Sequence, residues 1–322
     1  MEKSEKSLIL FMPSIEGGGV EKNLILITNF LSLHLNGIKL ITFDNRYNKF
    51  FNKKVKIINE KKFNKNQIYS KYHKYFRCLK LLINEFYKNK NILVFSFQAN
   101  IYCIILSVIL GFKVLVRSNS SPSGWTKNFI KNFIFKIFFK FPIKIIVNSY
   151  KFKSQIDEQF KIKSEVIYNP LNKKEILKLS KTKVDLKKIF SKKSLKIINI
   201  GRFTDQKDHM TLLKSIRLVK KKINVKLLLI GYGPNLYKIQ NYIRQHSLLK
   251  NVKILPFKRN VYKYIKVADL FVLTSIFEGL PNVLLEAITL KKFIISTDCP
   301  TGPKEILNNG KYGDLIKIGD YE

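Results

Sequence analysis

Residues 270–290 read LFVLTSIFEGLPNVLLEAITL and hold the pattern from which the fold can be predicted. The opening run, residues 270–274, is a short apolar segment of the length and composition of a buried strand. Pro281 suits the first position of a helix, because its missing N–H would have no partner there. The stretch therefore predicts a strand, a loop and a helix, which is the repeating unit of a parallel sheet with crossover helices.

The same alternation of apolar runs and amphipathic helical stretches continues along most of the chain. It breaks once, where residues 168–171 lead into a Lys-rich segment, residues 172–193. We therefore predict an α/β protein of two Rossmann-like parallel-sheet domains, residues 1–171 and 172–322. The predicted strands are residues 8–12, 38–43, 92–97, 113–117 and 144–148, followed by 195–200, 225–230, 252–255, 270–274 and 293–296.

Composition allows a large core and leaves the meaning of the charge open. The chain has 322 residues, is 46% hydrophobic and carries a formal net charge of +38. Such a charge can indicate a nucleic-acid or anionic-membrane partner. The excess is almost all Lys and accompanies heavy use of Asn, Ile, Phe and Tyr, which is typical of an AT-rich coding bias. We interpret it as scattered, solvated charge, and nucleic-acid binding remains an alternative although no recognised motif supports it.

The sequence argues against a metal site, a cofactor, a signal peptide and a membrane-spanning segment. The three cysteines lie far apart and the four histidines form no ligand cluster, so we predict no metal site, no cofactor and a reducing cytosol. The apolar run near the N-terminus is too short for a signal peptide. The longest apolar run, residues 101–110, is far below the roughly 20 residues that span a bilayer. We expect a cytoplasmic protein.

Two loops at the carboxyl ends of predicted strands have the chemistry of anion sites. Residues 13–23 form a glycine-rich turn that leads into a helix, where backbone amides of Gly18 and Gly19 could approach an anion closely. A flexible turn is the alternative. After strand 195–200, Arg202 and Lys207 lie on one short loop, placed to clamp a phosphate or diphosphate. Arginine is scarce in this chain, which favours the ligand role.

The two acids of residues 277–287 flank an uncapped helix start. Glu278 lies in the loop and Glu286 in the second turn of the helix, whereas Leu280, at the predicted N-cap, has no side-chain oxygen. We predict that the orphan amides near Asn282 to Leu284 are left for a ligand. The alternative is a surface glutamate and an ordinary helix glutamate.

Taken in order, these motifs make the chain resemble the retaining glycosyltransferases of family 4, which have the GT-B fold. Their hallmark is Glu-x7-Glu, present here as Glu278 and Glu286. The accompanying motifs are residues 17–19, Gly201-Arg202 followed by Lys207, Ala268-Asp269, residues 296–300 and residues 302–307. The resemblance covers nearly the whole chain, and it is the ordered set of motifs that is specific.

The resemblance implies transfer of a hexose or N-acetylhexosamine from a nucleotide-sugar, UDP-linked in our prediction, to an acceptor hydroxyl with retention and without a metal. By motif, Glu278 would contact the donor sugar and Glu286 the ribose. Arg202 and Lys207 would neutralise the leaving diphosphate, where charge accumulates as the bond breaks. Gly18, Gly19, Gly279, Leu280 and Asn282 complete the predicted donor site. We assign no general base, because the leaving phosphate is thought to deprotonate the acceptor.

The sequence departs from the family pattern in two places. Many members have a histidine near the sugar on the N-terminal domain, whereas residues 116–120 here contain none, and we expect Arg117 or Asn119 in its place. The chain also ends at Glu322, before the final helices that are usual in this fold, so we expect it to be a partial product. A sugar-nucleotide epimerase of the same fold is the alternative enzyme, although the additional acids and histidine of such epimerases cannot be located.

Residues 127–144, KNFIKNFIFKIFFKFPIK, predict an amphipathic helix that Pro142 ends. Its apolar face could lie in the interface of an anionic membrane, which would favour a lipid-linked glycan acceptor in surface-polysaccharide synthesis. The alternative is a face packed on its own sheet. The predicted apolar face comprises Phe129, Ile130, Phe133, Ile134, Ile137, Phe138 and Phe141, and Lys131, Lys136 and Lys140 lie on or beside the other face.

Overall fold

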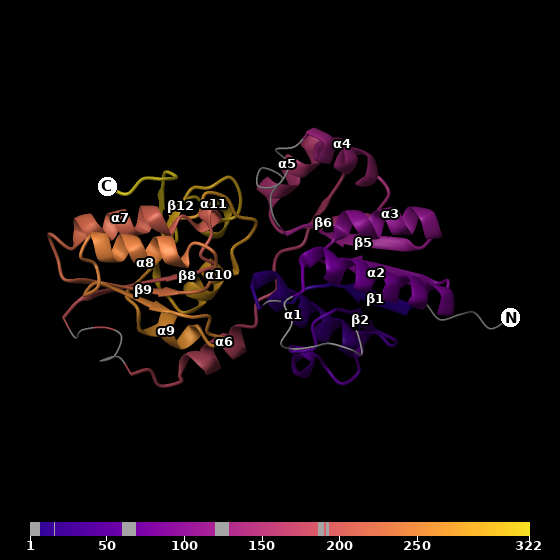
Figure 1. Cartoon of the computed structure of the whole chain (residues 1–322), viewed down its shortest axis with the longest axis horizontal. Helices are drawn as coiled ribbons and strands as arrows, with labels where there is room; N and C mark the ends of the chain where they lie inside the picture. Colours follow the sequence, from indigo (N-terminus) through magenta and orange to yellow (C-terminus); the bar gives the residue numbers. More distant parts are fainter. Residues whose placement is uncertain (1–6, 16, 60–68, 120–128, 186–189, 191–192) are drawn as a thin grey trace. The chain divides into compact units, whose positions relative to one another are not determined.

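The computed structural model describes residues 7–15, 17–59, 69–119, 129–185, 190 and 193–322. The chain divides into two compact units, residues 1–170 and residues 171–322. Each unit is a parallel sheet covered by helices on both faces (Figure 1). The crossover helices follow from the topology, because consecutive parallel strands need a long connection.

The N-terminal unit has a seven-stranded sheet in the order β3-β2-β1-β4-β5-β6-β7. Its strands are β1 (Ser7–Phe11), β2 (Lys39–Ile41), β3 (Lys56–Ile58), β4 (Ile92–Ser96), β5 (Lys113–Arg117), β6 (Lys144–Val147) and β7 (Glu165–Val166). Its helices are α1 (Gly19–His34), the short 3-10 helix η1 (Asn48–Phe50), α2 (Lys71–Lys88), α3 (Asn100–Leu110), α4 (Phe129–Phe138) and α5 (Tyr150–Phe160).

Alternate residues of β1 build two separate apolar layers on the two faces of this sheet. Ile9 and Phe11 belong to the layer that packs under α2, α3 and α5. Leu10 and Met12 belong to the layer under α1. Burial on both faces explains why the strands of this chain read as continuous apolar runs and not as alternating ones.

The C-terminal unit has a six-stranded parallel sheet in the order β10-β9-β8-β11-β12-β13. Its strands are β8 (Leu195–Ile200), β9 (Val225–Ile230), β10 (Val252–Leu255), β11 (Leu270–Leu273), β12 (Phe293–Thr297) and β13 (Asp314–Ile316). Its helices are α6 (Lys173–Ser180), the 3-10 helix η3 (Asp205–Lys207), α7 (His209–Val219), α8 (Leu236–Gln245), α9 (Tyr262–Val267), α10 (Asn282–Thr289) and α11 (Pro303–Ile306).

Helices α7 and α8 cover one face of the second sheet, and α6, α9 and α10 cover the other (Figure 1). Each layer is held by side chains of alternating strand positions, such as Ile197 on one face and Ile198 on the other. The strand order reverses between β8 and β11, so the chain runs outward from the middle of the sheet in both directions. This is the strand order of a Rossmann sheet.

All the strands predicted from apolar runs form, and three short ones were missed. The missed strands β3, β7 and β13 contain three, two and three residues and lie at sheet edges. An edge strand is paired on one side only and needs few apolar residues, so it leaves a weak signal in the sequence. The prediction of two Rossmann-like parallel sheets is confirmed.

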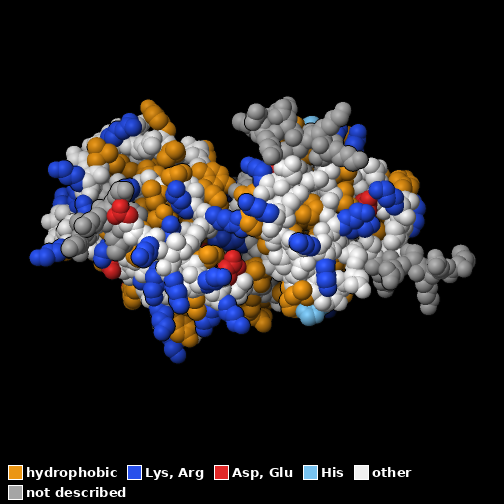
Figure 2. Space-filling view, turned by 90° about the horizontal axis from the view of Figure 1, so that it is seen from below, with side chains coloured by type: hydrophobic (Ala, Val, Ile, Leu, Met, Phe, Trp, Pro, Cys, Tyr) orange, Lys and Arg blue, Asp and Glu red, His pale blue; other side chains and the backbone are white. Residues whose placement is uncertain are grey.

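Basic side chains are spread widely. On the face shown in Figure 2, Lys and Arg side chains cover both units and are interleaved with apolar ones, without gathering into a single stripe. Few acids accompany them on this face. The distribution favours solvated charge over a dedicated nucleic-acid surface.

Candidate active site

The loops that follow β8 and β11 meet at the carboxyl edge of the C-terminal sheet. These strands are hydrogen-bonded neighbours, and the strand order reverses between them. In open α/β sheets, a crevice opens at such a reversal because the two following helices lie on opposite faces, and ligands bind there. The sheet order therefore places the Arg202–Lys207 loop and the Glu278 loop at the position expected of a binding site.

The loop after β8 presents one exposed cation and one that is largely buried. Arg202 is exposed, and among the described residues no acid pairs with its guanidinium. Residues 205–207 form the turn η3, which carries Lys207 back over Gly201. The close approach of the next loop requires glycine, because a Cβ on Gly231 would lie 1.9 Å from the Gly201 carbonyl oxygen.

Lys207 and Glu278, predicted independently as site residues, are in direct contact. The Lys207 ammonium donates a hydrogen bond to Oε1 of Glu278, and both side chains are largely buried. The same Oε1 accepts a hydrogen bond of 2.6 Å from the Ser275 hydroxyl. Glu278 is thus fixed by one cation and one hydroxyl group. Because an ammonium has three donors, Lys207 can hold Glu278 and still donate to a phosphate.

The loop between β11 and α10 is attached to the loop after β8. The Thr274 hydroxyl donates to the carbonyl oxygens of Lys207 and Asp208, at 3.1 and 2.9 Å. The Gln206 side-chain amide donates to the Phe277 carbonyl oxygen at 2.8 Å, and the Ile276 N–H donates to the Gln206 carbonyl oxygen at 2.8 Å. These bonds hold the Lys207–Glu278 pair in place from the backbone of both loops.

A third loop, which follows β12, packs against the same segment. The Thr301 hydroxyl donates to the Glu278 carbonyl oxygen, and the Thr297 hydroxyl donates to the Ser275 carbonyl oxygen at 2.6 Å. Gly302 has a φ of 90°, and a Cβ there would lie 2.3 Å from the Gly279 carbonyl oxygen. Only glycine permits this contact between the two backbones.

Helix α10 begins one residue later than predicted. It starts at Asn282, and Pro281, with φ −70° and ψ 107°, occupies the N-cap that we had assigned to Leu280. Proline can stand there because its ψ is extended, and its carbonyl oxygen accepts the Leu284 N–H at 3.0 Å. The predicted exposure of amides up to Leu284 is therefore wrong at that residue. The helix start still lacks a side-chain cap, as predicted.

Glu286 lies on the buried side of α10. It is 2% exposed, and the Tyr262 hydroxyl donates to its Oε1 at 3.4 Å. Gly279 and Leu280 are likewise buried, and Asn282 is half-buried. The predicted donor-binding residues of this segment thus form a continuous stretch beside Glu278, and their roles remain predictions.

The glycine-rich loop of the N-terminal unit leads into α1 as expected. Gly17 has a φ of 90°, Gly18 is the N-cap and Gly19 is the first helical residue. The N-cap residue of this helix, Gly18, has no side chain that could cap it. Residue 16 lies outside the described residues.

Arg117 and Asn119 occupy internal positions. Arg117 is 1% exposed, and its Nη2 donates to the Ile167 carbonyl oxygen at 3.0 Å and to Oδ1 of Asn169 at 2.9 Å. Burial lowers the pKa of the Arg117 guanidinium to about 10. Asn119 is half-buried and donates to the Phe97 carbonyl oxygen at 3.2 Å. These contacts give Arg117 a structural role in tying β5 to the segment after β7, and Ser120 of the predicted loop lies outside the described residues.

Sequence reasoning missed the residues that hold the acids and cations in place. Ser275, Thr301 and Gln206 carry short polar side chains in loops, where such residues are common, so nothing in their identity distinguished them. Their position did offer a signal, because all three follow predicted strands of the same sheet. The carboxyl ends of parallel strands meet at one edge, which predicts proximity of the loops but not the individual contacts.

Two buried groups beneath the loops have strongly shifted pKa values. Burial, with a contribution from the Lys207 charge, lowers the pKa of His209 to about 4. Among the described residues, neither ring nitrogen of His209 has a hydrogen-bond partner, and the ring lies edge-on to Phe203. Burial, followed by the Glu278 charge, raises the pKa of the Cys299 thiol to about 12. Both groups are therefore neutral near pH 7.

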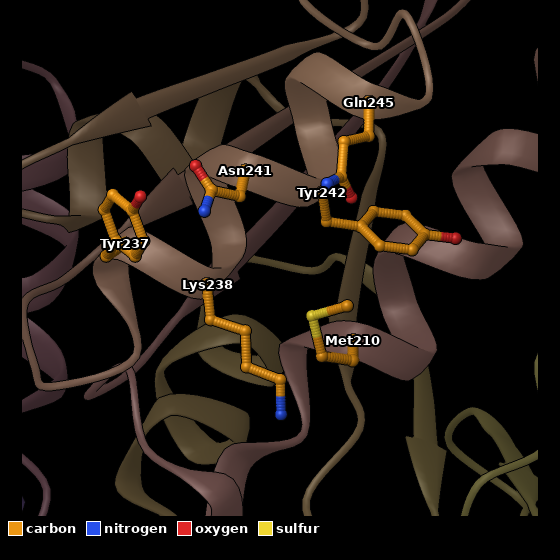
Figure 3. A pocket seen from close by; sticks show the side chains of 6 residues that line it. All are labelled: Met210, Tyr237, Lys238, Asn241, Tyr242 and Gln245. Carbon is orange, nitrogen blue, oxygen red and sulfur yellow. The ribbon is translucent and has the colours of Figure 1, made fainter.

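A shallow pocket of about 390 Å³ lies elsewhere on this unit, between α7 and α8. Figure 3 shows Tyr237, Asn241 and Gln245 spaced along α8, with Met210 of α7 facing them. None of the predicted site residues lines it. Across the described ranges there is no cluster of His, Cys, Asp and Glu that could hold a metal ion. No helix within those ranges is both long and apolar enough to cross a bilayer.

Comparison with known families agrees with this geometry. Residues 181–322 match the family model described as "Glycosyl transferases group 1". The C-terminal unit belongs to the group 1 glycosyl transferases. Within this glycosyl transferase domain, the matched segment contains Arg202, Lys207, Glu278 and Glu286, and the resemblance inferred from the motifs is confirmed.

Curated relatives extend the match into the rest of the chain. One is an uncharacterized glycosyltransferase, MJ1059, of Methanocaldococcus jannaschii, 35% identical over 64% of this chain and 56% of its own length. Another is the N-acetylgalactosamine-N,N'-diacetylbacillosaminyl-diphospho-undecaprenol 4-alpha-N-acetylgalactosaminyltransferase of Campylobacter jejuni, 25% identical over 67% of this chain and 60% of its own length. The chain thus spans less than two thirds of the length of these relatives.

The fold of the whole chain is that of solved glycosyltransferases. The crystal structure of Anabaena Alr3699/HepE in complex with UDP and glucose aligns with 98% of this chain and 86% of its own, with a TM-score of 0.76 and 17% identity. The GT-B prediction is therefore confirmed at the level of the fold.

Proposed function

We propose that the protein is a retaining glycosyltransferase that moves a hexose or N-acetylhexosamine from a UDP-sugar to a glycan acceptor. The observation that carries the proposal is the contact between Lys207 and Glu278 beside the exposed Arg202, at the point where the strand order reverses. A diphosphate needs fixed cations, and a sugar needs oxygen atoms that accept its hydroxyl hydrogens. The loops after β8 and β11 supply both the cations and the accepting oxygen atoms. The UDP bound to the Anabaena structure supports uracil as the base.

In this proposal each residue has a separate task. Arg202 and Lys207 stabilise the charge that grows on the β-phosphate as the glycosidic bond breaks, and the start of α10 adds the positive end of its dipole. Glu278 accepts hydrogen bonds from the donor sugar and Glu286 from the ribose. Two cations and a helix start supply the stabilisation that a divalent metal would otherwise give, so we propose that no metal is required. The leaving phosphate takes the acceptor proton.

The acceptor is proposed to be a lipid-linked glycan of surface-polysaccharide synthesis. The name of the Campylobacter relative specifies a diphospho-undecaprenol substrate, which supports a membrane-borne acceptor. The surface of α4 supports it independently. Phe129, Ile130 and Phe133 are 84%, 66% and 57% exposed, so the apolar face is not packed on its own sheet.

Helix α4 packs through its opposite side instead. Phe135, Phe138 and Phe139 contact the core, which corrects our assignment of Phe138 to the outer apolar face. Residues 127 and 128 of the predicted helix lie outside the described residues. Lys136 and Lys140 are exposed near the outer face, where they could pair with anionic headgroups. We propose that this face docks on the anionic inner leaflet of a cytoplasmic membrane. Neither the epimerase nor the nucleic-acid alternative gains support from the relatives.

A panel of UDP- and GDP-sugars, tested for binding and slow hydrolysis, examines the proposal directly. We expect one UDP-sugar to bind and turn over, and Arg202→Ala to weaken binding of that donor about 10- to 100-fold, as the loss of charge-assisted hydrogen bonds predicts. Arg217→Ala is the matched control, because Arg217 is an exposed arginine on α7, away from the loop. Equal weakening by both substitutions, or no donor that binds, would contradict the proposal.

A further inference from the structure

A buried polar cluster lies beneath the glycine-rich loop of the N-terminal unit, and nothing in the proposed function uses it. Its centre is Asp44, which follows β2 and is 1% exposed. Oδ2 of Asp44 accepts the backbone N–H of Ile15 at 3.1 Å and the Lys74 ammonium at 3.1 Å. Lys74, in the first turn of α2, also donates to the Ser14 hydroxyl at 3.1 Å.

Hydrogen bonds from the cluster and its neighbours hold the backbone of the loop just after β1. Besides the bond from Ile15 to Asp44, the Ser14 N–H donates to Oε1 of Gln98 at 2.8 Å. The Phe43 N–H donates to the Pro13 carbonyl oxygen at 3.1 Å. The segments after β2 and β4 thus clamp the residues just before Gly17, which turns the chain into α1 with a positive φ.

The acid at the centre of the cluster is compensated by cations. A lone carboxylate under the loop would repel a diphosphate, and a buried lone carboxylate would be costly. Asp44 instead has two cationic partners, because Nη2 of Arg46 donates to its Oδ1 at 3.1 Å. Lys74 and Arg46 thus compensate the buried Asp44 carboxylate, while the acid still fixes the backbone.

We infer that Asp44, held by Lys74, is a positioning residue that fixes the backbone of the glycine-rich loop where it leads into α1. The inference rests on the proposed function for the part concerning the donor. The anchoring of the loop stands on the contacts alone. Asp44 itself touches no substrate, so its effect passes through the amides of Gly18 and Gly19.

Hydrogen exchange of the intact protein tests the anchor without relying on activity. In Asp44→Ala, amides of the segment 12–24 should exchange at least about tenfold faster than in the unchanged protein, while the strands of both sheets keep their protection. The double substitution Asp44→Asn/Lys74→Met should restore slow exchange, because an amide oxygen can still accept the Ile15 N–H and no buried charge is left unpaired. Arg46 loses its acidic partner, but its side chain is 55% exposed and stays solvated.

The matched control is the other buried ion pair between β2 and α2. The Lys39 ammonium lies 2.7 Å from Oε2 of Glu85, near the opposite end of α2 from Lys74. Lys39→Met removes this ion pair while Glu85 keeps its second partner, Lys88, at 2.6 Å. We expect the substitution to destabilise the unit without altering exchange of the glycine loop.

Turnover of the donor tests the catalytic part of the inference separately from the anchoring of the loop. We expect Asp44→Ala to lower kcat about tenfold and to change the Kd for UDP less than threefold, because the residues proposed to bind the nucleotide lie in the other unit. Unchanged exchange of segment 12–24 in Asp44→Ala, or equal acceleration in Lys39→Met, would overturn the inference. Faster exchange with unchanged kcat would overturn its catalytic part. If even the unchanged protein turns over no donor, the proposed function fails while the exchange result still decides the anchor.

Discussion

Lys207 takes part in two interactions: its ammonium pairs with Glu278, and it is also proposed to bind the donor diphosphate. The pair neutralises a buried acid that would otherwise be costly to desolvate. A donor that brings both a diphosphate and sugar hydroxyls can engage the two groups together, whereas a nucleoside diphosphate alone offers nothing to Glu278.

This coupling predicts opposite effects on two ligands. In Glu278→Gln, Lys207 loses its acidic partner and becomes a freer cation, so affinity for UDP should stay the same or rise by a few-fold. Transfer from the UDP-sugar should fall at least about 100-fold, because the neutral amide is a poorer acceptor for the sugar hydroxyls. Calorimetry with UDP and a transfer assay give the two numbers. A parallel loss of UDP affinity would show that Glu278 serves only to hold the loop.

At the scale of elements, the loop after β8 and the start of α7 enclose a histidine that the fold keeps neutral. His209 is 3% exposed, and its folded-state pKa of about 4 lies below the ordinary value of 6.5. Between these two pH values the unfolded chain binds a proton that the folded chain does not. The stability that neutral His209 contributes is therefore complete above pH 6.5 and is lost as the pH falls toward 4.

Chemical unfolding at two pH values can measure this contribution. From pH 7.5 to pH 5, His209 should cost the C-terminal unit about 2 kcal/mol of unfolding free energy. His209→Leu should remove this part of the pH dependence and leave that of the carboxylates. The difference between their free energies of unfolding at pH 7.5 gives the effect of the substitution on packing, because His209 is neutral in both states at that pH. A difference between them that does not vary with pH would contradict the prediction.

At the scale of the whole molecule, the exposed face of α4 and the net charge of +38 predict adsorption to anionic membranes. The intact protein should float with vesicles containing about 30% anionic lipid at moderate salt and much less with neutral vesicles. Phe133→Ser/Ile137→Ser should weaken binding at least tenfold, because a buried apolar side chain contributes roughly 1.5–3 kcal/mol.

Tyr237→Ser is the control for this experiment. Tyr237 is 72% exposed on α8 of the other unit, so it tests whether any exposed aromatic residue promotes binding. Flotation that depends on charge but is equal in all three proteins would attribute binding to the scattered lysines. Absence of flotation with anionic vesicles would remove the membrane proposal.

The sequence by itself determined the α/β class and the core strands, and it predicted Arg202, Lys207, Glu278 and Glu286 as site residues. These depend on local information, since apolar runs, turn residues and motif order are all contiguous in the chain. It failed at the edge strands, at the first residue of α10 and at the side of α4 that carries Phe138. The edge strands and the packed side of α4 depend on neighbours distant in sequence, whereas the start of α10 depends on the extended conformation of Pro281.

Only the tertiary structure decided how these residues act together. The order of the strands set β8 beside β11 and so brought Lys207 into contact with Glu278, 71 residues away. It also buried Arg117 against Asn169 and placed Asp44 under the glycine loop. Pairing of strands and burial of charge are long-range properties of the packed chain, and a local pattern carries little information about them.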